Sequence, residues 1–298
     1  MEKLLRAYKV EIKPTQKQIE KINQSIGICR WLYNQYLFTN NQLYAQYKKG
    51  FIDKKQYGYI PVGEKVISGT VSKKYNRYYV SVIIDTDWNI PSGEYTEGIG
   101  IDLGVKDLAI CSNKQKFKNI NKTQKIRKLE EKLEREQKRL SKKYESLKLR
   151  NKKGEATRQN IQKQIVKVQS IHQRLTNIRI DYINKTIYEI VKQKPSYITI
   201  EDLNVRGMMK NRHLSKAVVQ QKLYEFRNKL NYKCNLFGIE LRIVDRFYPS
   251  SKLCNNCGSI KSDLKLKDRI YKCHCGYIED RDYNASLNLK DAKIYKIA

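Results

Sequence analysis

The order of hydrophobic and polar positions predicts a strand followed by a helix at the start of the chain. Residues 4–12 alternate between apolar and polar side chains, and Pro14 marks the end of this predicted strand. Thr15 and Gln18 then form a capping-box pattern ahead of isoleucines at helical spacing. An amphipathic helix should therefore follow the first strand.

A pair of strands and a linker complete this first part of the chain. Apolar residues gather at 66–71 and 78–84, and the polar segment 73–77 between them predicts a turn. We expect residues 1–85 to form a small strand-rich module that holds one helix. The Pro-Ser-Gly segment that follows predicts an interdomain linker over residues 86–97.

A long pair of helices is predicted inside the remaining domain, residues 98–298. Short apolar runs at 99–101 and 108–111 predict two strands ahead of it. Between about 122 and 193 the chain is highly charged, with leucines and isoleucines at spacings of three and four. An Asn-Lys-Lys-Gly break at 151–154 makes this segment a helical hairpin. Its Lys and Arg face is either a solvated surface or a contact for nucleic acid.

The segment after the hairpin alternates strands and helices. An apolar run at 197–200 predicts a buried strand, residues 216–236 predict a helix, and residues 240–244 predict another strand. A final helix is predicted over residues 283–291. This alternation predicts an α+β or α/β fold with a mixed sheet at its core.

The charge of the chain indicates what kind of molecule it binds. Lys and Arg number 61 against 30 Asp and Glu, which gives a formal net charge of +31. Such a basic surface favours nucleic acid, and the 22 tyrosines add rings that can stack on unpaired bases. A ribosomal-type or merely soluble basic protein is the alternative. The sequence has no long apolar run and no signal-peptide pattern, so we expect no membrane partner and a prokaryotic cytosolic or nucleoid location.

Three carboxylates in separate segments of so basic a chain are candidate metal ligands. Asp102 lies in an apolar strand, Glu201 at the end of another, and Asp282 at the start of the final helix. A charge at such positions is costly unless it is paired or binds a cation. Together the three could hold two Mg²⁺ or Mn²⁺ ions about 3.5–4 Å apart, an arrangement that hydrolyses phosphodiesters.

Each carboxylate taken alone has a simpler interpretation, because an Asp after a strand is usually a turn or cap residue. Three neighbouring aspartates are alternative candidates: Asp107, Asp202 and Asp280. Three basic residues flank the carboxylates but are assigned no catalytic role, since Lys and Arg are frequent throughout the chain: Lys106, Arg206 and Arg281.

Four of the seven cysteines have the spacing of a zinc site: Cys254, Cys257, Cys273 and Cys275. Their two short knuckles can offer four thiolates to one tetrahedral Zn²⁺. The odd total and this local cluster fit a reduced compartment better than a disulfide framework. The second knuckle is one residue short, so it should be distorted, and His274 could replace one cysteine. Four reduced, unliganded cysteines are the alternative.

The predicted zinc ribbon, at about residues 250–278, directly precedes Asp282. Zinc binding should therefore fold the segment that delivers this carboxylate, which gives the ion a structural role and not a catalytic one. The three remaining cysteines are interpreted as packing residues: Cys29, Cys111 and Cys234.

Four motifs, in family order and over nearly the whole chain, resemble the TnpB (OrfB) family of transposon-encoded, RNA-guided DNA endonucleases. They are GIDLGVKDLA at 100–109, IEDLNVRGM at 200–208, FYPSSK at 247–252 and DRDYNA at 280–285. The resemblance implies an N-terminal wedge module and an RNase H-like (RuvC) nuclease domain, with the helical hairpin and the zinc ribbon as insertions. It also implies a guide RNA and a target DNA as partners, with base pairing reading the sequence and the protein reading duplex shape.

Carried over residue by residue, the family's nuclease triad falls on Asp102, Glu201 and Asp282, with Asp280 as the alternative for the last place. One departure concerns residues 40–63, a short Tyr, Gln and Lys-rich stretch where the family usually carries a helical recognition segment. The recognition part of the first module should therefore be reduced.

Three functions follow from these features. The leading hypothesis is a metal-dependent DNA endonuclease of a transposable element, guided by RNA. The alternative is a shortened or repurposed relative that binds RNA or DNA as a regulator without guided cleavage. A weaker hypothesis is a transposase that joins DNA ends. The number of subunits is left open by the sequence.

Overall fold

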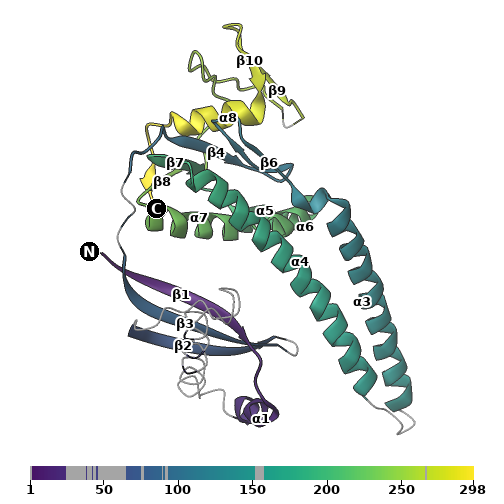
Figure 1. The fold of residues 1–298 in the computed structure, drawn as a ribbon. Coiled ribbons are helices and arrows are strands. Elements are labelled where there is room, and N and C mark those ends of the chain that lie inside the picture. Colours follow the sequence, from purple (N-terminus) through teal and green to yellow (C-terminus); the bar gives the residue numbers. More distant parts are fainter. Residues whose placement is uncertain are drawn as a thin grey trace. The chain divides into compact units, whose positions relative to one another are not determined.

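The computed structural model describes residues 2–24, 38, 42, 45, 65–74, 77–88, 90, 93–151, 158–265 and 267–298. The chain forms two compact units, Met1–Asn89 and Ile90–Ala298 (Figure 1). The division between them falls within residues 86–97, the segment that we expected to link two domains.

The first unit is built around a three-stranded antiparallel sheet in the order β1-β3-β2. Its elements are β1 (Glu2–Ile12), α1 (Gln16–Gln24), β2 (Lys65–Lys74) and β3 (Arg77–Trp88). Alternate residues of the central strand, Val80, Val82 and Ile84, are buried against side chains of β1 and β2. The predicted capping box is confirmed: Thr15 N donates to Gln18 Oε1 at 2.7 Å, and Gln18 N donates to the Thr15 hydroxyl at 3.4 Å.

Strand β3 runs on to Trp88, past the predicted end at residue 84, so the linker is shorter than predicted. The reason is that β1 offers backbone partners over this whole length, with Glu2 opposite Trp88. Cys29 and the stretch 40–63, except for two single residues, lie outside the described part of the chain.

The second unit contains a mixed six-stranded sheet in the order β11-β8-β7-β4-β5-β6. Its strands are β4 (Ile99–Leu103), β5 (Asp107–Cys111), β6 (Lys116–Lys118), β7 (Tyr197–Glu201), β8 (Glu240–Val244) and β11 (Lys296–Ile297). Strands β4, β7 and β8 run parallel, whereas β5, β6 and β11 pair antiparallel with their neighbours. The predicted mixed sheet is thereby confirmed, and the short β6 and β11 are additions at its edges.

Helices cover both faces of this sheet. The remaining elements are a 3₁₀ turn (Ile120–Lys122), α3 (Gln124–Asn151), α4 (Gln159–Val191), α5 (Val205–Lys210), α6 (Arg212–Gln221), α7 (Leu223–Phe237), β9 (Ile270–Lys272), β10 (Ile278–Asp280) and α8 (Arg281–Lys290). In Figure 1, α8 lies on one face of the sheet, and α4 and α7 lie on the other. Ile187 of α4 and Phe226 of α7 join the strand residues Ile101, Ile198 and Ile200 in one buried core. The strands are apolar because helices bury both of their faces.

The long helices α3 and α4 pack along each other over the range predicted for the helical hairpin (Figure 1). Ile126 and Leu175 take part in a small buried core between them. The buried amide of Gln164 donates to the Glu136 carboxylate at 2.6 Å and to the Glu136 carbonyl oxygen at 3.0 Å. This satisfied polar pair helps to set how the two helices align. The predicted turn after Asn151 lies outside the described residues.

The predicted single helix at 216–236 is wrong. The chain forms two helices there, α6 and α7, with Lys222 between them in the left-handed conformation (φ 54°). The buried side chain of Gln221, at the end of α6, donates to the Gly104 carbonyl oxygen at 3.1 Å. A contact so distant in sequence cannot be inferred from local periodicity. The short α5 was not predicted either.

The close approach of α8 to β4 depends on Gly100. A Cβ atom at this position would collide with the carbonyl oxygen of Ser286 and the backbone nitrogen of Lys290, both in α8. These are backbone atoms, so they cannot move aside as a flexible side chain can. Any larger residue at position 100 would push α8 away from the sheet.

Candidate active site and zinc centre

Two of the predicted carboxylates lie side by side because their strands are parallel neighbours. The register of β4 and β7 pairs Ile101 with Ile200. The next residues, Asp102 and Glu201, therefore stand at the same level near the carboxyl ends of both strands. Paired positions in neighbouring strands project their side chains to the same face of a sheet. Two acidic groups from distant segments thus meet at one edge of the sheet.

The third carboxylate, Asp282, comes from the first turn of α8. This helix reaches the site because it packs closely on β4 at Gly100. Asp102, Glu201 and Asp282 all line one pocket of about 370 Å³. The structure therefore brings the three predicted residues to one place.

Three carboxylates around one pocket repel one another. Burial raises the pKa of Asp102 well above its ordinary value, and the charges of Glu201 and Asp282 raise it further. Burial also raises the pKa of Glu201, which the hydrogen bond from the Ser250 hydroxyl partly offsets. Such a cluster is costly without a counter-charge, so it fits divalent cations bound among oxygen ligands.

Two arginines supply part of the positive charge. Arg281 Nη2 lies 3.0 Å from Asp282 Oδ1. Arg269 Nη1 lies 3.9 Å from the other oxygen of the same carboxylate. Both arginines line the pocket. They could also bind a phosphate group that enters it, since a guanidinium matches phosphate oxygens in geometry and charge.

The carboxylate oxygens surround the pocket loosely. Among the described residues, only Cys254, Cys257, Cys273 and Cys275 form a set of three or more whose ligand atoms all lie within 4.8 Å of one another. The three carboxylates are thus spread more widely than the ligands of a single-ion site.

The neighbouring aspartates have other contacts. Asp280 is the N-cap of α8, where its carboxylate accepts hydrogen bonds from two backbone N–H groups of the first turn, at 3.0 and 3.1 Å. Asp202 is held by two arginines, whose hydrogen bonds lower its pKa. Asp107 does line the pocket, but its carboxylate lies 3.2 Å from Lys116 Nζ. Asp280, the alternative to Asp282, is thus a capping residue in this structure.

Sequence reasoning missed Ser250 and Arg269, and it left Arg281 without a role. The Ser250 hydroxyl donates to Glu201 Oε1, and both Ser250 and Arg269 line the carboxylate pocket. A signal existed for Ser250 alone, within the FYPSSK motif. Arg269 belongs to the zinc-ribbon segment, and no local pattern distinguishes it among 61 basic residues.

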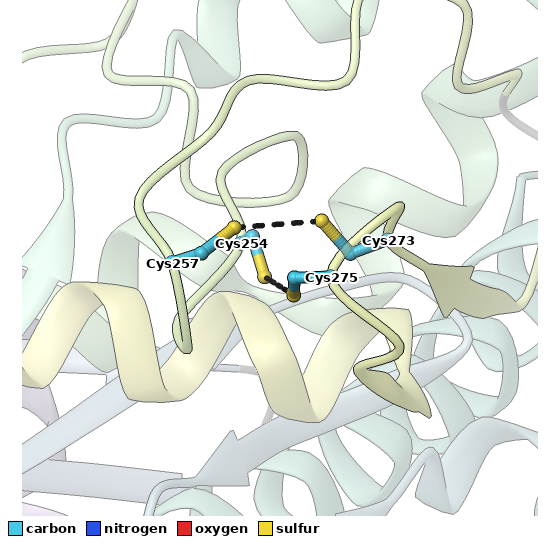
Figure 2. Close-up of side chains that lie close together, drawn as sticks. All are labelled: Cys254, Cys257, Cys273 and Cys275. Carbon is cyan, nitrogen blue, oxygen red and sulfur yellow. Dashed lines mark hydrogen bonds between the residues drawn. The ribbon is translucent and has the colours of Figure 1, made fainter.

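Four cysteines converge in the zinc ribbon, from the two knuckles that the spacing predicted (Figure 2). Cys254 Sγ lies 3.8 Å from Cys275 Sγ. Cys257 Sγ lies 3.6 Å from Cys273 Sγ. A tetrahedron with Zn–S bonds of about 2.3 Å has S···S edges of about 3.8 Å. The four thiols could therefore hold one zinc ion.

His274 is not needed as a ligand, because the set of four cysteines is complete without it. Within this set, hydrogen bonds from Ser259 lower the pKa of Cys257 to about 6. The other two described cysteines are core residues: Cys111 and Cys234 are fully buried among apolar side chains. The packing roles predicted for them are confirmed.

Two buried asparagines of α8 tie the zinc ribbon to the carboxylate pocket. Asn288 Nδ2 donates to the carbonyl oxygens of Ser250 and Leu253, both at 2.7 Å. Asn284 Nδ2 also donates to the Leu253 carbonyl oxygen at 2.7 Å. Leu253 directly precedes the first knuckle. This knuckle, Ser250 and helix α8 are therefore held together.

Three family models match successive parts of the chain. One described as "Helix-turn-helix domain" (HTH_OrfB_IS605) matches residues 1–49, and one described as "Probable transposase" (OrfB_IS605) matches residues 79–212. A third, "Cas12f1-like, TNB domain", matches residues 224–289. The second match includes Asp102 and Glu201, and the third includes Asp282 and the four clustered cysteines.

Curated relatives match most of this chain. A "Putative RNA-guided DNA endonuclease" of Streptomyces pristinaespiralis is 33% identical over 231 residues, which are 77% of this chain and 54% of the relative. The "Putative RNA-guided DNA endonuclease InsQ" of Escherichia coli (strain K12) is 30% identical over 236 residues, 74% of this chain and 55% of the relative. The chain thus spans about half the length of these relatives.

Among the solved structures that align with this chain is a Cas12f1-sgRNA-target DNA complex. It aligns with a TM-score of 0.47 and 19% identity over 76% of this chain and 56% of that chain. A CRISPR-Cas12f ternary complex aligns with a TM-score of 0.45 and 20% identity over 77% of this chain and 46% of that chain. Within the described ranges, no helix combines the length and the apolar character needed to cross a membrane.

Proposed function

We propose that this chain, whose matching family models and relatives are those of the OrfB (TnpB) transposon proteins, is a metal-dependent, RNA-guided DNA endonuclease of a transposable element. One observation carries the proposal. Asp102, Glu201 and Asp282, from three distant segments of a chain with a net charge of +31, line one pocket. Acidic side chains gather in this way where divalent cations are bound for work on a phosphate backbone.

The three carboxylates would hold two Mg²⁺ or Mn²⁺ ions. When bound, these ions supply an activated water for attack on the phosphodiester and stabilise the leaving 3′ oxygen. The raised pKa of Asp102 supports this assignment, because a carboxylate that burial and like charges disfavour gains most from a cation. Ser250 holds the Glu201 carboxylate in place. Arg269 and Arg281 put positive charge where the scissile phosphate would lie.

We infer an RNase H-like (RuvC) arrangement for the second unit. Strand β4, which carries Asp102, has the antiparallel β5 and β6 on one side and the parallel β7 and β8 on the other. The α3–α4 pair and the zinc ribbon would be insertions into this core. One zinc ion on four thiolates would be structural, since that set leaves no open coordination position.

A guide RNA and a target DNA are the proposed partners. Base pairing would read the target, while the basic surface holds the backbone and reads duplex shape. The first module, residues 1–85, would act as a wedge with a reduced recognition segment, and residues 98–298 would form the nuclease domain. We place the protein in the prokaryotic cytosol or nucleoid, where such partners occur.

The variant Asp102→Ala provides the test. The full chain is purified with its bound RNA, the RNA is sequenced, and a matching DNA duplex is added with Mg²⁺. We expect the wild type to cut this duplex, and the variant to bind it equally well without cutting. Unchanged cutting by the variant would reject the triad.

One second candidate is a regulator that binds RNA or DNA without guided cleavage. The basic excess, a formal net charge of +31, favours nucleic-acid binding whether or not the chain cuts. That candidate predicts tight binding by the wild type but no Mg²⁺-dependent cutting of the matched duplex. Joined DNA ends in place of cut ends would instead indicate a transposase.

A further inference from the structure

A second pocket, of about 240 Å³, lies next to the carboxylate pocket and shares Glu201 and Leu103 with it. Much of its lining is apolar and comes from Leu103, Ile200, Leu203, Val205 and Leu223. These side chains belong to the main core or pack against it, so this part of the pocket is fixed. The pocket lies below the usual range for drug-sized ligands, about 300–1,000 Å³. It suits a small ligand group.

One aromatic side chain in the lining of this pocket is largely exposed to solvent. Tyr224, in the first turn of α7, lines the pocket although the residue is 65% exposed. Aromatic side chains usually bury most of their ring, because an exposed ring leaves apolar area in water. A flat ligand group stacked on Tyr224 would cover this area. Nucleobases stack on aromatic side chains in this way in single-strand-binding proteins.

Arginines complete the lining: Arg206, Arg227 and Arg246. Asp202 orients two of them, since its Oδ1 accepts from Arg227 Nη1 at 2.7 Å and its Oδ2 accepts from Arg246 Nη2 at 2.8 Å. A guanidinium has five N–H donors, so each arginine keeps donors for a ligand. The three arginines outnumber the two acids beside them, Asp202 and Glu201, which favours an anionic backbone near the pocket.

We propose that this pocket binds the base of the nucleotide next to the scissile phosphate in the DNA strand that is cut. The base stacks on Tyr224 against the apolar lining, and its flanking phosphates lie beside Arg227 and Arg246. The cut strand is the occupant because Glu201 borders both pockets, so a strand in the carboxylate pocket continues into this one. The proposal rests on the nuclease function proposed above and names how its substrate strand is held.

A fluorescent base tests the stacking. The full chain, without Mg²⁺, is mixed with short oligo-dT strands that each carry a single 2-aminopurine, moved along the strand from one probe to the next. Stacking on an aromatic ring quenches this base. We expect the wild type and Tyr224→Phe to quench it at a preferred position. In Tyr224→Ala the quenching should be lost and the affinity should fall about tenfold.

Tyr232→Ala is the matched control, because Tyr232 lies on the same helix, is 43% exposed and does not line the pocket. It should bind and quench like the wild type. Thermal unfolding checks that each variant is folded. Quenching that survives in Tyr224→Ala, or an equal loss in Tyr232→Ala, would overturn the proposal. So would stronger quenching with an RNA strand of the same sequence than with DNA.

The phosphate contact has its own measurement. Log affinity falls as log salt concentration rises. Arg246→Gln should make this fall less steep, by about one unit of slope, while Tyr224→Ala leaves the slope unchanged. An unchanged slope in Arg246→Gln would remove the phosphate part of the proposal. Neither the quenching nor the salt slope needs cleavage, so both stand apart from the Asp102→Ala result. Failure of the pocket and failure of the nuclease can therefore be told apart.

Discussion

The Ser250 hydroxyl donates a hydrogen bond to the Glu201 carboxylate, although the two residues come from different segments of the chain. Glu201 ends strand β7, whereas Ser250 lies between β8 and the first zinc knuckle. Ser250 is buried, and its own carbonyl oxygen accepts a hydrogen bond from Asn288 of α8. Glu201, one of the candidate metal ligands, is therefore held by a residue that directly adjoins the zinc ribbon and helix α8.

Ser250→Ala should slow DNA cleavage while leaving DNA binding close to that of the wild type. The substitution removes a hydrogen bond to a carboxylate, and a loss of this kind corresponds to a rate about 10- to 100-fold lower. Single-turnover cleavage of the matched duplex at saturating Mg²⁺ measures the effect. The control is Ser215→Ala on α6, whose hydroxyl donates to the Arg212 carbonyl oxygen at 3.3 Å, within the same helix. Equal rates in the two variants would remove Ser250 from the site.

Asp102→Asn should make the protein more stable when no Mg²⁺ is present. The substitution removes a charge that burial and two neighbouring carboxylates disfavour, and relief of such strain at a functional site typically adds about 0.5–2 kcal/mol. Denaturant unfolding in Mg²⁺-free buffer measures the change. Added Mg²⁺ should stabilise the wild type through binding and the variant much less. A variant that is less stable than the wild type in Mg²⁺-free buffer would contradict the charge-repulsion argument.

Removal of zinc should abolish cleavage through loss of structure. The knuckles, Ser250 and α8 are linked by hydrogen bonds, so unfolding of the ribbon should displace the helix of Asp282. A zinc-selective chelator followed by Mg²⁺ should give no activity, and added Zn²⁺ should restore it. Elemental analysis should find zinc retained in His274→Ala and lost in Cys275→Ser. The opposite outcome would show that His274 replaces a cysteine as ligand.

Gly100→Ala should destabilise the second unit strongly. The added methyl group meets backbone atoms of α8, which can yield only if the helix moves, and overpacking costs of about 3 kcal/mol or more are expected. Gly69→Ala is the control, because a Cβ there would lie 3.9 Å from its nearest neighbour, the Ser81 carbonyl oxygen. Hydrogen exchange of the backbone amides of α8 measures the loss of stability. Protection equal to that of the wild type would contradict the close packing.

Local patterns were enough to predict the regular elements with strong periodicity. The alternating residues 4–12 and the apolar run at 197–200 form strands, and the leucine and isoleucine spacing from 122 to 193 forms two long helices. The single helix predicted at 216–236 failed because the chain breaks at Lys222, directly after Gln221, whose side chain bonds to the Gly104 carbonyl oxygen. That contact lies far outside the window in which periodicity acts.

The sequence by itself determined the candidate side chains: three acids in motifs, four cysteines in knuckles and a basic excess that favours nucleic acid. Residue types and short spacings are local properties, so they can be inferred without a fold. Only the tertiary structure decided that Asp280 caps α8 while Asp282 lines the pocket, and that Ser250 holds Glu201. It also decided that Tyr224 lines the second pocket, which shares Glu201 with the carboxylate pocket. These relationships depend on strand register and helix packing, which arise from contacts between residues far apart in the chain.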